Sequence, residues 1–127
     1  MNCRLNILCS IVFSVFTFTF LAQNYCPEKR LLLEKYKAGD YIQSKAYIDT
    51  VLLRCPDQKD NAYFWHISAF INFNIFQKVD NKSPISKARK EAVSAVLKSI
   101  ELDKDDQYLQ HNHQVINVLA NGFYNHY

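Results

Sequence analysis

The stretch from Glu91 to Asp106, EAVSAVLKSIELDKDD, constrains the fold more than any other part of the sequence. Its small and apolar residues recur every three or four positions, and an acidic run follows them. This pattern is typical of a short amphipathic helix that ends in a turn. A looser copy lies upstream, from Tyr41 to Asp57. Because two similar units occur in one short chain, the sequence predicts an array of helical repeats.

Composition supports helices joined by short loops. The 127 residues suffice for one small domain, and they include only two glycines and three prolines. So few turn-forming residues disfavour a β-meander or a glycine-rich phosphate loop. The net charge of +3 is too small to indicate nucleic-acid binding, which usually needs a clustered basic face.

The N-terminus has the pattern of an export signal. Arg4 precedes an uncharged run from Leu5 to Ala22, and cleavage after Ala22 would leave a mature domain of residues 23–127. The residues around this cleavage point, Leu21-Ala22-Gln23, resemble the signal-peptide ends of exported Bacteroidetes proteins. We therefore expect a periplasmic or cell-envelope location. The alternative is an uncleaved anchor, because 18 residues can just span a bilayer.

The mature chain begins with an expected helical hairpin. Pro27 suits the first turn of one helix, Gly39 suits its exit, and Asp40 can cap a second helix that Pro56 stops. The start of the first helix then lies beside the end of the second. Because this places Cys26 near Cys55 in an oxidising compartment, the sequence predicts a disulfide between them. Two buried free thiols are the alternative.

Three more helices are expected, which gives an all-α chain of about five helices after the signal. The third, from Asp60 or Asn61 to about Gln77, is rich in aromatic residues and uncharged from residue 61 onward. The fourth should start at Ser83-Pro84, carry Ile85 on its apolar side and end near Leu102. The fifth should run from about Gln107 to the C-terminus.

These residues resemble the tetratricopeptide repeat (TPR), a helix–turn–helix unit of about 34 residues. Ala92 stands at the small position of its second helix, Val96 at the bulky one, and Ser99 at the next small one. Residues 23–127 are thus identified as a TPR-like solenoid whose last repeat is incomplete, because no second helix follows the fifth. We therefore expect either the N-terminal piece of a longer protein or a partner that supplies the missing packing.

The resemblance implies a groove that binds a peptide or protein partner. Carried over from the family, its lining consists of Trp65, Ala69, Asn72 and Phe73 in the middle unit and of Gln114, Asn117, Asn121, Tyr124 and Asn125 in the last. Amide side chains can donate and accept hydrogen bonds along an extended backbone. The alternative is that these amides only face the missing helix.

Other functions have weaker support. His111 and His113 point in different directions on a helix, and His66 suits a hydrogen-bonded packing residue, so we expect no metal site. No catalytic pairing or cofactor motif is present in the sequence, so we expect neither an enzyme nor a cofactor. Basic residues between Lys78 and Lys90 form either a solvated loop or a contact for an acidic partner or anionic lipid. The second function hypothesis is a docking arm of a longer envelope enzyme or sensor.

Overall fold

The computed structural model describes residues 25–124, and this part of the chain is all-helical, as predicted. Its elements are α2 (Pro27–Lys37), α3 (Tyr41–Arg54), the short 3-10 helix η1 (Pro56–Asp60), α4 (Ala62–Lys78), α5 (Lys87–Leu102) and α6 (Leu109–Tyr124). The expected signal or anchor, residues 1–22, lies outside the described residues. Within residues 25–124, no helix is both long enough and apolar enough to cross a bilayer.

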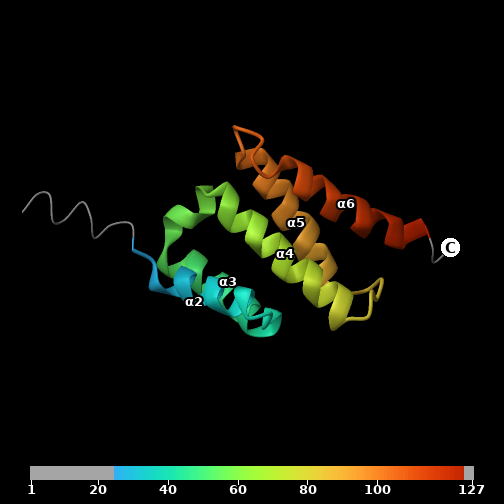
Figure 1. Ribbon diagram of the computed structural model, residues 1–127, viewed down its shortest axis with the longest axis horizontal. Helices are drawn as coiled ribbons and strands as arrows, with labels where there is room; N and C mark the ends of the chain where they lie inside the picture. The colour runs from blue at the N-terminus through green and yellow to red at the C-terminus, as the bar shows by residue number, and fades with distance from the viewer. Residues whose placement is uncertain (1–24, 125–127) are drawn as a thin grey trace, which may run out of the picture.

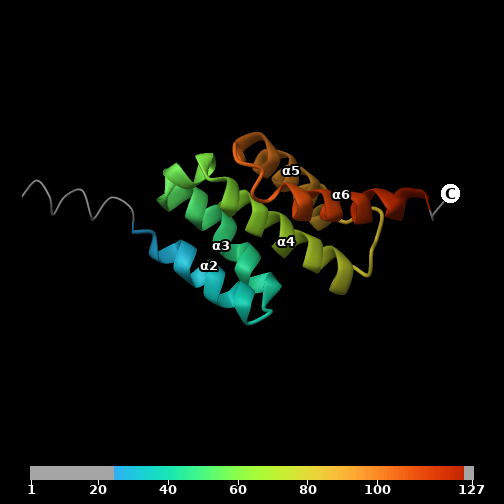
Figure 2. The ribbon, with the colours of Figure 1, turned by 45° about the horizontal axis from the view of Figure 1, so that its top comes forward.

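The helices pack in chain order, each against its neighbours in the sequence. α2 and α3 form one antiparallel hairpin, and α4 and α5 form a second. α4 lies in the middle of the molecule, with α3 on one side and α5 on the other (Figures 1 and 2). α6 packs mainly on α5 and touches α4. Two walls, α3 and α5, therefore flank a central helix.

Local sequence explains the first helix boundaries. Gly39 takes φ +76° and ends α2, a conformation that costs glycine little because it lacks a Cβ. Asp40 Oδ1 then accepts a hydrogen bond from Gln43 N (3.1 Å) and caps α3. Asn61 Oδ1 caps α4 in the same way through Phe64 N (3.1 Å). The expected cap at Asp40 is therefore in place, and of the two expected starts of the third helix, Asp60 and Asn61, the cap is Asn61.

The expected start of the fourth helix is wrong by one turn. α5 begins at Lys87, and its cap is Ser86, whose Oγ accepts from Arg89 N (3.1 Å). Ser86 Oγ also donates to Asp80, which holds the loop closed. Ile85 therefore lies outside the helix and is 86% exposed rather than packed on the apolar side.

Small residues let α4 and α5 pack closely. Ala92 and Ser99 on α5 and Ser68 on α4 are fully or almost fully buried. The buried hydroxyls have partners, since Ser68 Oγ donates to Phe64 O (2.9 Å) and Ser99 Oγ donates to Ala62 O (3.0 Å). Burial of small side chains without unsatisfied hydroxyls allows close backbone approach at little cost.

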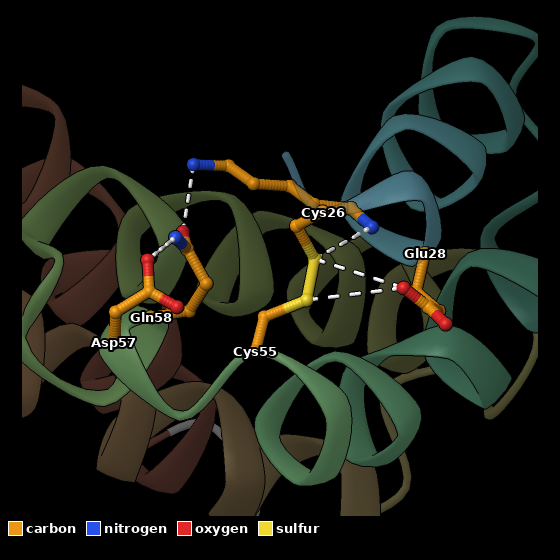
Figure 3. The surroundings of a disulfide bond; sticks show 6 residues. Cys26, Glu28, Cys55, Asp57 and Gln58 are labelled. Carbon is orange, nitrogen blue, oxygen red and sulfur yellow. Dashed lines mark hydrogen bonds between the residues drawn. A yellow bond between two sulfur atoms is a disulfide. The ribbon is translucent and has the colours of Figure 1, made fainter. Parts of the chain in front are cut away.

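The predicted disulfide between Cys26 and Cys55 is present and joins the start of α2 to the end of α3 (Figure 3). Beside it, Lys29 Nζ donates a hydrogen bond to Gln58 Oε1 (2.7 Å). Burial lowers the pKa of Lys29, and the nearby Asp57 carboxylate opposes this effect. The base of the first hairpin is thus fixed by both a covalent bond and a polar contact.

Candidate partner-binding cleft

An open cleft of about 640 Å³ lies over α4, between α3 and α5. α4 supplies Trp65, Ser68 and Asn72 to its lining. Ile48 and Leu52 of α3 add apolar surface. Clefts of about 300–1,000 Å³ with mostly apolar walls and a few polar groups are typical of ligand sites. The size and surface of this cleft are therefore those of a binding site.

Two side chains at the floor of the cleft are held by hydrogen bonds. The indole Nε1 of Trp65 donates to Lys59 O (2.8 Å), which ties the ring to η1. Asn72 is only 4% exposed, and its Nδ2 donates to Ser68 O (3.0 Å). Asn72 Oδ1 is buried and has no hydrogen-bond partner among residues 25–124. An unsatisfied buried oxygen costs about 1–3 kcal/mol, which a suitable donor could recover.

Charged side chains surround the apolar part of the cleft. Its lining contains four lysines and two carboxylates, an excess of two positive charges. These residues are Lys45, Asp49, Lys87, Lys90, Glu91 and Lys98. The carboxylate of Glu91 pairs with Lys45 on α3 and with Lys87 on its own helix (3.5 Å). Lys90 is exposed and has no ion pair in the described part of the chain.

Only some of the residues predicted for the groove of the middle unit line the cleft. Trp65 and Asn72 line the cleft, whereas Phe73 is half-buried and packs edge-to-face against Phe70 (6.5 Å between ring centroids). Ala69 is fully buried.

The described residues among those predicted for the last unit lie away from this cleft. Gln114, Asn117 and Asn121 are exposed on α6, which contributes no residue to the lining. Tyr124 is in the last turn of α6, and its side chain and Asn125 fall outside the described residues. The structure therefore brings together two of the predicted residues in one cleft.

Sequence reasoning missed the walls of the cleft. The contributions of α5 recur at helical spacing over residues 87, 90, 91, 94, 95 and 98, which places them on one face. From the sequence alone, Lys87 and Lys90 are assigned only to a basic cluster between Lys78 and Lys90. The helical spacing of charged and small residues on α5 was the available signal, but nothing local indicated that α3 would face it.

A hydrogen-bonded cluster of polar side chains lies between α4, α5 and α6 and consists of His66, Ser99 and Asn112. Asn112 is fully buried; its Nδ2 donates to Ser99 Oγ (2.9 Å), and its Oδ1 lies 2.8 Å from His66 Nδ1. Because the amide group already donates to Ser99, His66 Nδ1 is the donor to Asn112 Oδ1. The imidazole also stacks on Tyr108 (4.7 Å). These hydrogen bonds link α4, α5 and α6 to one another.

Burial lowers the pKa of His66 from its ordinary value of 6.5. The hydrogen bond to Asn112 opposes this effect, and the nearby His111 adds to it. The neutral imidazole is therefore the form that the fold favours.

One group of potential metal ligands occurs in residues 25–124: Cys26, Glu28 and Cys55. Glu28 Oε2 lies 4.0 Å from Cys26 Sγ and 3.8 Å from Cys55 Sγ (Figure 3). Metal coordination by cysteine requires a thiolate, and the disulfide consumes both thiols. The group therefore stabilises the hairpin rather than offering a metal site.

The described residues thus contain one cleft with the properties of a binding site. The hydrogen-bonded cluster of His66, Ser99 and Asn112 is separate from it and has a structural role. Comparisons of the chain with protein-family models, with curated proteins and with solved structures found no match.

Proposed function

We propose that this protein is an exported, TPR-like interaction module that holds a peptide or protein partner in the cleft between α3, α4 and α5. One observation carries the proposal: a cleft of about 640 Å³ combines an apolar lining with a rim of lysines. Protein-binding surfaces commonly combine an apolar centre with a polar, solvent-accessible rim.

The packing supports a TPR-like array. Two antiparallel hairpins follow one another, and small residues are buried at matching points of their second helices, Ser44 in α3 and Ala92 in α5. The cleft departs from the groove that the resemblance implies. Its walls are the second helices of the two hairpins, α3 and α5, and only its floor comes from a first helix, α4.

Export by residues 1–22 remains part of the proposal. The disulfide between Cys26 and Cys55 supports it, because such bonds persist mainly in oxidising compartments such as the periplasm. After cleavage of the signal, the cleft would meet its partner in the cell envelope.

The second candidate is a docking arm of a longer envelope enzyme or sensor. The exposed face of α6 favours it, since Val118 is 45% exposed beside the exposed amides of Asn117 and Asn121. A following segment could cover this face. Reading the coding sequence beyond Tyr127 tests this candidate: an open frame into a new domain would support it, and a stop codon would refute it.

Site-specific photocrosslinking tests the cleft. Benzoylphenylalanine at Ser94, which is exposed and lines the cleft, should form an adduct with one protein when the full chain is expressed in its own cells. The matched control is benzoylphenylalanine at Leu97, which is exposed on another face of α5 and does not line the cleft. Equal adducts at both positions, or none at either, would refute the proposal.

A further inference from the structure

We propose that the occupant of the cleft is an extended segment of another polypeptide in which apolar and acidic residues alternate. This inference rests on the proposed function and names the chemistry of the partner.

The charged side chains around the cleft indicate which charge the partner should carry. Lys45 and Lys87 share one carboxylate, that of Glu91. Lys98 pairs with Glu101 (3.0 Å), and Lys90 has no ion pair in the described residues. Lysines commonly lay their aliphatic stems on apolar surface and keep the ammonium group in water. The mouth of the cleft therefore presents excess positive charge to solvent, and carboxylates of a partner would complement it.

The apolar lining determines what enters. Ile48 and Leu52 form one wall and Trp65 lies at the floor. In an extended chain, successive side chains point to opposite sides. A segment with alternating residues can thus place its apolar side chains against the floor while its carboxylates face the lysines at the mouth.

The length of the cleft limits the segment. The lining of α5 extends from Lys87 to Lys98, which corresponds to about 16 Å at about 1.5 Å per residue. An extended chain covers that distance with about five residues at about 3.3 Å each. The segment in the cleft is therefore short, with room for two or three apolar side chains.

Asn72 favours an extended backbone over a helix. Within the described residues its Oδ1 is buried beside the cleft without a partner, and it can accept a hydrogen bond from a segment that displaces the atoms covering it. The N–H groups within a helix are already bonded to its own carbonyl groups, whereas an extended segment has N–H groups available. A helix has free N–H groups only in its first turn, whereas an extended segment offers main-chain donors along its whole length.

The chain contains its own reporter, because Trp65 is its single tryptophan and lies in the cleft. The probe is a blocked peptide of about six residues that alternates leucine and glutamate, added to the mature protein while tryptophan fluorescence is followed. We expect saturable binding that weakens as salt is raised. A leucine–lysine peptide of the same length and dodecanoate, an anion without a peptide backbone, serve as comparisons. Equal or tighter binding of either one would overturn the inference.

Paired variants locate the binding. Lys90→Glu should weaken the leucine–glutamate peptide by about three- to tenfold, since it replaces one attraction by a repulsion at an exposed site. Lys104→Glu makes the same charge change at an exposed position outside the cleft and should leave affinity unchanged. Ser94→Glu adds a carboxylate to the cleft lining and should weaken the same peptide, whereas Leu97→Glu on another face of α5 should not. Equal effects within either pair would contradict the assignment.

A backbone variant of the peptide tests its conformation. N-methylation of its amides removes the donors and should reduce affinity at least about fivefold; unchanged affinity would refute the extended backbone. If no peptide perturbs Trp65 but crosslinking from Ser94 still captures a protein, this inference fails while the proposed function stands.

Discussion

Removal of the disulfide should destabilise the protein strongly. Cys26 and Cys55 are 29 positions apart, and the chain-entropy relation assigns about 3.6 kcal/mol to closing a loop of that length. Domains of this size are typically stable by about 5–15 kcal/mol, so the bond accounts for a large share. We therefore expect the double variant Cys26→Ser/Cys55→Ala to lose about 3–4 kcal/mol of unfolding free energy.

The choice of serine separates two roles of Cys26. Its sulfur lies 3.4 Å from Lys29 N at the N-cap of α2, so alanine would remove a capping atom as well as the crosslink. Serine keeps a capping oxygen. Cys26→Ala/Cys55→Ala should therefore be less stable than the serine variant by up to about 1 kcal/mol.

Urea unfolding followed by circular dichroism measures both variants. The dependence of free energy on urea should steepen without the crosslink, because the unfolded chain exposes more surface. A loss of less than about 1 kcal/mol with an unchanged slope would refute the view that the disulfide acts by restricting the unfolded chain.

Three other perturbations test the helical framework. Asn112→Leu leaves His66 and Ser99 without their buried partner and should cost about 2–4 kcal/mol in urea unfolding, whereas Asn117→Leu on the exposed face of α6 should change stability by no more than about 0.5 kcal/mol. The pKa of His66 is lowered in the folded state, so the unfolded chain binds more protons below pH 6.5 and this residue should reduce stability as pH falls. His66→Gln should weaken that decline. An unchanged dependence of stability on pH would contradict the lowered pKa of His66. Gly39→Ala should cost about 1 kcal/mol, measured by thermal unfolding, because φ is +76° while no atom lies within 4 Å of the added Cβ; a stabilised variant would show that the turn carries no strain.

Much of the fold follows from local sequence. Asp40 and Asn61 cap helices because each side chain reaches an N–H three residues ahead. The disulfide was predictable because a short hairpin returns the chain to its starting point. Serine is a residue type that caps helices, so Ser83 and Ser86 were both candidates, and only Ser86 caps α5. Asn81 and Lys82 adopt positive φ and Asp80 accepts a hydrogen bond from Ser86, which carries the chain one turn further before the helix begins.

The cleft was less predictable because its parts come from three helices. Trp65 and Asn72 were recognised through one helix, but Lys45 and Glu91 are 46 positions apart and meet only in the folded protein. The burial of Asn112 could not be predicted from the sequence for the same reason. The sequence contains several amides in α6, and burial of this one depends on Ser99 of another helix.

Amide chemical-shift mapping tests the central claim most directly. The leucine–glutamate peptide should be titrated into isotopically labelled mature protein while backbone amide signals are followed. The account predicts that the largest shifts fall in the helix segments that line the cleft, at residues 45–52, 65–72 and 87–98. Largest shifts at residues 114–121 of α6, with the cleft unperturbed, would contradict it.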